Sequence, residues 1–407
     1  MFHLLLAIIY LAFISLGLPD SLLGSAWPSM YQEFQVPVSY AGVISMIIAA
    51  GTIVSSLLSD RLTRKFGTGK VTMVSVAMTA AALFGFSMSH SFWALCLWAV
   101  PYGLGAGGVD ASLNNYVALH YASRHMSWLH CMWGVGASLG PSIMSFALTR
   151  GQTWNMGYRY ISLIQIALTV VLLFSLPLWK KNASSAQGES SVGTDGGAEL
   201  DTGTETPAGE GEALSLKKIL GIPGAKEIMV TFFCYCALEQ TAGLWAGSYL
   251  ALHAGLSGQQ AAGYAGLFFL GITIGRGASG FLTMKLKDTQ MIRLGQGLIL
   301  LGILALLLPF GEITALVGLA VVGLGCAPVY PCIIHSTPEH FGAASSQALI
   351  GVQMASAYVG TCFMPSVFGL VANHISVSLF PVYLAVILIL MVLMHERMLR
   401  KRESESR

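Results

Sequence analysis

The chain alternates long apolar runs with short polar loops, and this pattern predicts a bundle of membrane-spanning helices. A helix needs about 20 mostly apolar residues to cross a bilayer, and twelve runs reach that length. They lie at roughly 4–30, 39–59, 71–89, 92–119, 127–148, 158–179, 225–252, 261–284, 290–309, 313–336, 344–372 and 377–396. Because hydrocarbon offers no water to unpaired backbone groups, we expect an all-α integral membrane protein.

One polar segment divides the twelve runs into two sets of six. Residues 182–213 are rich in Gly, Ser, Thr and Ala, and they hold seven acids but no Lys or Arg. Such a composition cannot form a packed core. We therefore expect an N-terminal six-helix bundle at 1–181, an acidic cytoplasmic linker at 182–216, and a C-terminal six-helix bundle with a basic tail at 217–407.

Charge adds an orientation to this picture. Only 10% of the residues are charged, against about 25% in an ordinary soluble domain. Of the 21 Lys and Arg, 18 fall in the loops on one side, the linker and the tail. The positive-inside rule then places both termini in the cytoplasm, in an inner or plasma membrane that the chain crosses many times. The apolar N-terminus lacks a basic n-region, so we expect a retained first span rather than a signal peptide.

The two sets of six runs also repeat weakly in sequence. Gly136 matches Gly360 and Pro141 matches Pro365 at an offset of 224, and Gly103-Leu104-Gly105 recurs as Gly323-Leu324-Gly325. Parallel repeats of six spans, with substrate held near the midplane between them, are the plan of one large class of transporters. The paired prolines predict corresponding breaks in the fifth and eleventh spans.

Two carboxylates lie where a membrane protein should tolerate only hydrocarbon. A charged side chain at the bilayer centre costs at least about 2.5 to 3.5 kcal/mol, so it usually serves a function. Asp110 has Asn114 one helical turn away, and Asp20 follows Gly17-Leu18-Pro19, where the helix is expected to break. We expect Asp20 and Asp110 to hold a coupling cation or proton. The alternatives are a structural ion pair for Asp110 and a capping role for Asp20.

The seventh span carries a set of residues suited to a sugar. Glu239 and Gln240 lie near its middle, with Trp245 and Tyr249 one and two turns further on. Sugars present hydroxyls to polar groups and C–H faces to aromatic rings, so we expect all four to bind substrate. The alternative for the two aromatic residues is a place in the interfacial belt.

Other polar residues within the spans extend this candidate site. Arg276 is the one base that we place within a span, against the three acids Asp20, Asp110 and Glu239. We therefore expect a bound cation or protons to balance the charge. The alternative is a structural ion pair of Arg276 with Glu239 or Asp110. His130 offers a hydrogen bond or a proton relay. Tyr330 occupies the repeat position of Asp110, and Gln353 lies in the eleventh span. We include all four as substrate-binding candidates.

The loop after the second span resembles a signature of the major facilitator superfamily. That signature usually reads Gly-x-x-x-Asp-Arg-x-Gly-Arg-Lys, and here Ser56–Lys65 keeps Asp60, Arg61, Arg64 and Lys65 while both glycines are replaced. The resemblance covers essentially the whole chain. It implies the twelve-helix major facilitator fold, with these four charged residues forming a conformational latch on the cytoplasmic side.

Within that superfamily the chain is similar to the fucose-galactose-gluconate symporter branch and its sodium-dependent glucose transporter relatives. The features that carry this resemblance are Gly17-Leu18-Pro19-Asp20, Asp110 with Asn114, and Tyr235 with Glu239 and Trp245. It implies that acids in the first and fourth spans handle the coupling cation and contact sugar, which adds Asn114 to the substrate-binding candidates.

No phosphate-binding loop, nucleophile elbow or zinc-protease motif occurs, so we expect no enzyme. The seven cysteines show no metal or disulfide spacing.

We expect a secondary transporter that works by alternating access and couples H⁺ or Na⁺ to uptake of a neutral sugar or sugar-like molecule. No other cofactor, no metal and no nucleic acid is expected, and a monomer in the bilayer suffices. Proton-coupled export of a lipophilic drug or metabolite is the alternative, and a receptor that binds without transporting is a further one.

Overall fold

The N-terminal half of the chain is a bundle of long helices. The computed structural model describes residues 2–121, 123–189, 216–308 and 311–405, and every regular element in these ranges is helical. The first half contains α1 (Phe2–Asp20), α2 (Leu22–Glu33), α3 (Tyr40–Phe66), α4 (Thr68–Met88), α5 (Phe92–His120), α6 (Ser123–Thr149) and α7 (Trp154–Glu189). Helix α7 therefore continues beyond residue 181, where the linker was expected to begin; residues 190–215 of that linker lie outside the described ranges.

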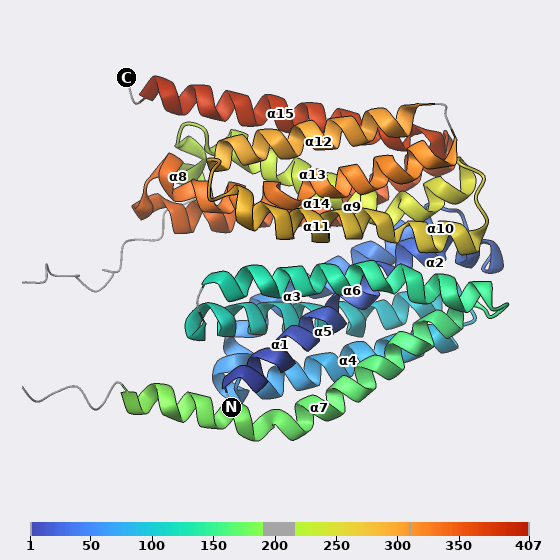
Figure 1. Cartoon of the computed structure of the whole chain (residues 1–407), viewed down its shortest axis with the longest axis horizontal. Coiled ribbons are helices and arrows are strands. Elements are labelled where there is room, and N and C mark those ends of the chain that lie inside the picture. The colour runs from blue at the N-terminus through green and yellow to red at the C-terminus, as the bar shows by residue number, and fades with distance from the viewer. Residues whose placement is uncertain (1, 122, 190–215, 309–310, 406–407) are drawn as a thin grey trace, which may run out of the picture.

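The C-terminal half repeats this arrangement. It contains α8 (Leu216–Gly221), α9 (Ala225–Leu252), α10 (Gly258–Tyr264), α11 (Gly266–Leu282), α12 (Asp288–Leu307), α13 (Glu312–Phe341), α14 (Ala343–His374), the 3₁₀ turn η1 (Val377–Leu379) and α15 (Phe380–Glu405). Figure 1 shows the two halves as separate groups of roughly parallel helices, one above the other. The expected all-α membrane fold is confirmed.

The helices are long and apolar enough to cross a bilayer. Eleven described segments meet that requirement, with α1 and α2 counted together and α10 and α11 counted together. Helix α9 is equally long at 28 residues, and Glu239 with Gln240 in its middle lowers its mean hydropathy. Large apolar side chains cover the outside, such as Phe174 on α7 at 78% exposed, as expected for a surface that faces lipid.

Helix breaks occur at one expected position and not at two others. The first span breaks at Ser21, directly after Pro19 and Asp20, as the sequence predicts. The expected breaks at Pro141 and Pro365 are wrong, because α6 and α14 run through both prolines. A proline removes only one backbone donor, and packing against neighbouring helices keeps such a helix continuous.

Close helix crossings recur at corresponding positions of the two halves. A Cβ on Gly105 of α5 would lie 2.7 Å from the Ser75 carbonyl oxygen of α4, and one on Gly325 of α13 would lie 2.6 Å from the Gly295 carbonyl oxygen of α12. In both halves, therefore, the fourth span crosses the third at a glycine where no side chain fits. Small residues of this kind let membrane helices approach closely.

The two halves meet tightly at the end of the molecule remote from both termini. The Ser145 hydroxyl of α6 donates to the Gln259 carbonyl of α10 at 2.8 Å, and the Ser366 hydroxyl of α14 donates to the Gly42 carbonyl of α3 at 3.0 Å. Figure 1 places α2 and α10 together at this end, while the N- and C-termini lie at the opposite end. We call the end formed by α2, α10 and the adjoining loops the closed end.

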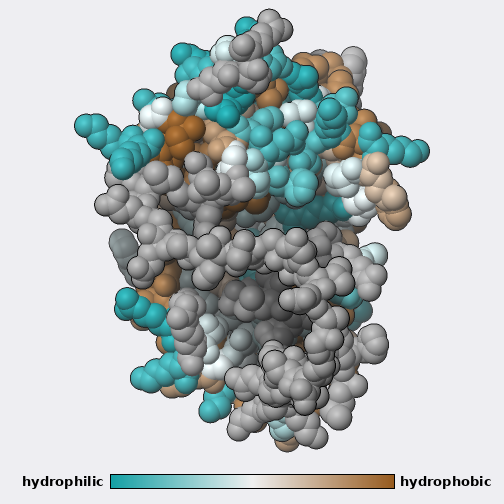
Figure 2. All heavy atoms as spheres, turned by 90° about the vertical axis from the view of Figure 1, so that its left-hand side faces the viewer, coloured by the Kyte–Doolittle hydropathy of each residue, from teal (hydrophilic) through white to brown (hydrophobic). Residues whose placement is uncertain are grey.

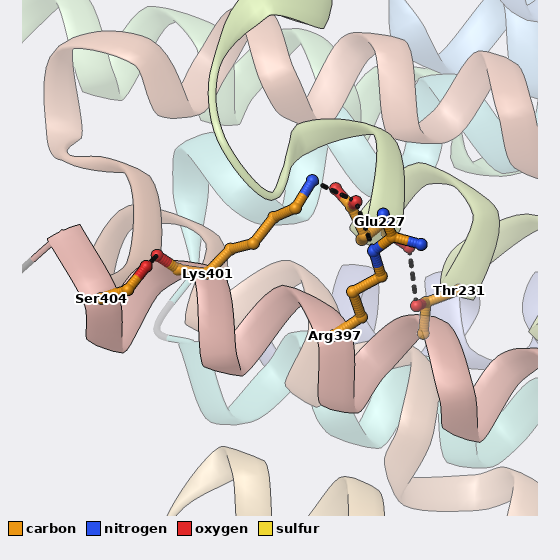
Figure 3. Close-up of polar contacts among 5 residues, drawn as sticks. All are labelled: Glu227, Thr231, Arg397, Lys401 and Ser404. Carbon is orange, nitrogen blue, oxygen red and sulfur yellow. Dashed lines mark hydrogen bonds and ion pairs between the residues drawn. The ribbon is translucent and has the colours of Figure 1, made fainter.

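The end that carries the termini is polar. Figure 2 shows hydrophilic side chains spread over this face. Three ion pairs near it tie α15 to its neighbours. Glu227 accepts from Lys401 Nζ at 2.6 Å and lies 3.5 Å from Arg397 Nε (Figure 3). Arg293 binds Glu396 through two nitrogens at 2.7 and 2.8 Å. Both termini lie toward this end of the molecule (Figure 1), and their placement in the cytoplasm stays a prediction from the loop charges.

Candidate functional site

Asp20 is held at the break between α1 and α2 by two neutral donors. The Tyr102 hydroxyl of α5 donates to Asp20 Oδ1 at 2.8 Å, and Trp133 Nε1 of α6 donates to Oδ2 at 2.8 Å. The carboxylate nevertheless remains exposed. Each oxygen keeps a lone pair that neither donor uses, so Asp20 has the orientation and the free acceptor capacity to bind a cation or a proton.

Asp110 and Asn114 form the pair that their spacing predicts. Asn114 Nδ2 donates to Asp110 Oδ1 at 2.9 Å along α5. The Asn114 Oδ1 atom is buried and has no hydrogen-bond partner among the described groups. Asp110 also lies close enough to Asp20 to interact electrostatically. The first and fourth spans thus bring two carboxylates within electrostatic range of one another, and this repulsion favours binding of a cation or proton by either of them.

Arg276 of α11 reaches across to the N-terminal half. Its guanidinium donates to the His130 carbonyl at 3.3 Å and lies 5.0 Å from the centre of the Trp133 ring. No described carboxylate lies within the 4.0 Å that defines an ion pair with it. The alternative of a structural ion pair with Glu239 or Asp110 is therefore not realised in this conformation, and a neutral ring and a carbonyl hold the charge instead.

The C-terminal half contributes Glu239 and a group of tyrosines. Tyr235, one turn before Glu239 on α9, has a buried hydroxyl and interacts electrostatically with both Glu239 and Arg276. Tyr330 of α13 interacts with both Glu239 and Asp110. These interactions connect the acids of the two halves into one polar region.

Gln240 points toward the space between the halves. It shares a face of α9 with Leu244 and Gly247, one and two turns further on. Those two residues pack against Gly24 of α2 in the opposite half. The Gln240 side chain itself is exposed, so this amide is available to a ligand between the bundles.

Three other substrate-binding candidates lie in the packed core, apart from this region. Trp245 is 0% exposed and donates Nε1 to the Pro365 carbonyl at 2.8 Å; Tyr249 is 1% exposed and its hydroxyl donates to the Leu306 carbonyl at 3.0 Å. Gln353, also 0% exposed, bonds the Thr337 hydroxyl at 3.3 Å. In this conformation each of these side chains is buried and already has a protein partner, and their contact with substrate stays a prediction.

The expected latch is described only in part. Arg61 and Lys65 are exposed near the end of α3, and Lys65 lies 5.3 Å from the Phe66 ring centre. The Asp60 and Arg64 side chains lie outside the described part of the structure. The latch therefore stays a prediction.

Sequence reasoning missed Tyr102 and Trp133, the two donors to Asp20. Both are neutral, so a search for charges inside apolar runs passes over them. Tyr102 precedes Asp110 by eight residues on α5, and Trp133 follows His130 by three on α6. Polar aromatic residues about one or two turns from a buried polar residue are the signal that points to them.

The whole fold is similar to that of two solved transporters. The nucleoside transporter NupG superposes with a TM-score of 0.73 at 11% identity, over 97% of this chain and 98% of that one. The peptide transporter POT superposes with a TM-score of 0.69 at 15% identity, over 95% of this chain and 92% of that one. At these identities the likeness concerns the fold.

Sequence comparison gives the family. Bypass of stop codon protein 6 of Saccharomyces cerevisiae is 22% identical over 292 residues, which are 68% of this chain and 56% of that protein, so the chain spans little more than half the length of this relative. The model of the Major Facilitator Superfamily matches residues 9–365. This chain therefore belongs to the major facilitator superfamily, a family of multi-pass membrane transporters and not of enzymes.

Proposed function

We propose that this transporter couples the downhill movement of H⁺ or Na⁺ to uptake of a neutral sugar or sugar-like molecule. The observation that carries the proposal is the unneutralised Asp20, which two neutral donors orient and which stays accessible. A carboxylate kept in a membrane protein without a basic partner is costly. Binding and release of a cation is the function that explains its retention.

The charge balance of the polar region supports coupling. Asp20, Asp110 and Glu239 face a single base, Arg276, and no described acid pairs with it. A cation that neutralises one of the acids lowers the cost of closing the site around a substrate. By thermodynamic linkage the substrate then tightens cation binding by the same factor.

The unused hydrogen-bonding groups suit a small molecule rich in hydroxyls. Asn114 Oδ1 has no described partner, and Gln240 is exposed. The Trp133 ring adds an aromatic face, against which the C–H groups of a sugar pack. With the orientation that the loop charges predict, the closed end is extracellular, so this conformation would release substrate into the cytoplasm during alternating access.

The test is uptake into proteoliposomes under an imposed proton or sodium gradient. The panel contains radiolabelled neutral sugars, nucleosides and dipeptides. With one cation per substrate, a tenfold gradient supports about tenfold accumulation. We expect Asp110→Asn to lose accumulation while retaining exchange of substrate across the membrane, since the neutral side chain no longer responds to the cation.

Asp288→Asn is the matched control, because Asp288 binds His335 at 2.6 Å at the start of α12, away from the polar region. It should accumulate substrate as the wild type does. If no compound of the panel accumulates under either gradient, the symport proposal fails. Proton-driven export of hydrophobic cations would then identify the alternative, an exporter of lipophilic drugs or metabolites.

A further inference from the structure

Trp133 is the one described side chain that contacts both the candidate coupling carboxylate and the unpaired base of the opposite half. Its indole Nε1 donates to Asp20 Oδ2 at 2.8 Å, and its ring centre lies 5.0 Å from the Arg276 guanidinium carbon. We propose that Trp133 is a positioning residue that transmits the charge state of Asp20 in the N-terminal half to Arg276 in the C-terminal half. This inference rests on the proposed cation coupling and names its route.

The N-terminal side of this link is rigid. A Cβ on Gly17 would lie 2.8 Å from the Ala137 backbone nitrogen, so α1 and α6 are in backbone contact beside Trp133. Gly140 and Gly136 of α6 also face α1 at contacts too close for a side chain. Because these two helices cannot slide apart without losing that packing, the indole stays in place over Asp20 when its charge changes.

The C-terminal side of the link is held by weaker contacts. The contacts described for the Arg276 guanidinium are the Trp133 ring at 5.0 Å and the His130 carbonyl at 3.3 Å, beside a longer-range electrostatic interaction with Tyr235. Beside it, the Ser138 and Thr273 hydroxyls approach to 3.3 Å across the two halves. A cation over an aromatic face is attracted by the negative charge density of the ring. Of the three linked residues, Arg276 is therefore the one whose binding weakens or strengthens when the charge density of the Trp133 ring changes.

Polarisation connects the two contacts. When an N–H group donates to an anion, the anion pushes electron density onto the donor, and hydrogen-bonded chains polarise one another in this way. An ionised Asp20 makes the Trp133 ring face more negative and strengthens its hold on Arg276. When a cation or proton neutralises Asp20, that hold weakens, so this conformation loses part of one contact between the halves, its closed end opens more readily, and Arg276 is freed toward substrate.

Tyr102 provides a matched comparison. It donates the second hydrogen bond to Asp20, also at 2.8 Å, but its ring contact is with Phe86 inside the N-terminal bundle. Trp133→Phe and Tyr102→Phe each remove one donor to the same carboxylate. Only Trp133→Phe interrupts the link to the opposite half.

The experiment measures opening of the closed end in the full chain without substrate. The seven native cysteines are replaced, and Ser29→Cys serves as reporter, because Ser29 of α2 lies beneath Gly258 of α10. Its alkylation rate by a hydrophilic maleimide reports the open fraction. Asp20→Asn serves as the neutral mimic, so the identity of the coupling cation is not needed.

We expect Asp20→Asn to raise the alkylation rate about threefold, the largest change that weakening a desolvated cation–π contact by about a third allows. The same rise should persist in the Tyr102→Phe background and fall below about 1.5-fold in the Trp133→Phe background. Thermal unfolding of each variant separates loss of coupling from loss of fold, because a merely structural role for Trp133 would lower stability but leave the response to Asp20→Asn intact.

Three outcomes would overturn this inference. They are an unchanged rate in Asp20→Asn alone, an intact response in Trp133→Phe, and an equal loss of response in both Phe variants. None of them decides whether the protein is a symporter, since gradient-driven accumulation tests that separately. Conversely, the wild type could fail to accumulate any substrate while the variants show the expected alkylation rates. That result would support the link from Asp20 to Arg276 and refute the symport proposal.

Discussion

Gly24 lies where α2 of the N-terminal half crosses α9 of the C-terminal half at the closed end. A Cβ at this position would come within 2.6 Å of the Gly243 carbonyl oxygen and 2.7 Å of the Leu244 carbonyl oxygen. Both obstacles are backbone atoms, so no side chain can rotate away. Gly24→Ala should therefore push the two halves apart at this crossing without disturbing the packing inside either bundle.

The size of the effect follows from the cost of overpacking, which is about 1 to 3 kcal/mol for a methyl group in a well-packed interior. That cost applies only when the closed end is closed, so the ratio of open to closed molecules should rise about 5- to 150-fold. Gly247→Ala should act in the same direction, because its Cβ would lie 2.5 Å from the Gly24 carbonyl oxygen.

The assay is the alkylation rate of Ser29→Cys in the cysteine-replaced chain. Gly277→Ala on α11 is the control, since a Cβ there meets nothing within 4 Å, and it should leave the rate unchanged. A well-folded Gly24→Ala protein that alkylates at the wild-type rate would refute the reasoning. It would mean that the α2–α9 crossing does not hold the closed end shut.

Two further predictions concern stability. Glu227→Gln removes the ionic partner of Lys401 on α15 and should lower the free energy of unfolding by about 1 kcal/mol, a value limited by solvent screening. Glu396→Gln should lower it by less, because the arginine partner of Glu396 is 55% exposed. Thermal unfolding that ranks the two variants the other way would contradict this. Trp245→Phe removes the donor to the Pro365 carbonyl and should cost about 1 kcal/mol with substrate affinity unchanged. Weaker substrate binding at unchanged stability would instead place Trp245 in the binding site.

The apolar pattern predicted the helices well because membrane insertion depends on local composition. Residues 71–89 were expected as a span and form most of α4 (Thr68–Met88), and the break after Pro19 falls where expected. The break at Ala265, between α10 and α11, was not expected. No proline marks it, and a break of this kind depends on the helices packed on either side.

The sequence pointed to the charged and amide members of the candidate site and missed Tyr102 and Trp133, the two neutral aromatic donors to Asp20. Asp20, Asp110 and Glu239 stand out because a charge within an apolar run is costly whatever surrounds it. Trp245 is different, since an indole in an apolar run fits a binding site and a packed core equally well. Its burial at 0% exposed depends on how α9 is rotated against α14.

The sequence by itself determined that this chain is a two-part array of membrane helices with acids at bilayer depth, because hydropathy and the cost of burying charge act along each segment separately. Only the tertiary structure decided that Trp133 joins Asp20 to Arg276, and that Arg276 has no acid beside it among the described residues. Those contacts join helices far apart in the chain. Their rotation and separation are set by backbone crossings such as Gly17 against α6, which no single stretch of sequence specifies.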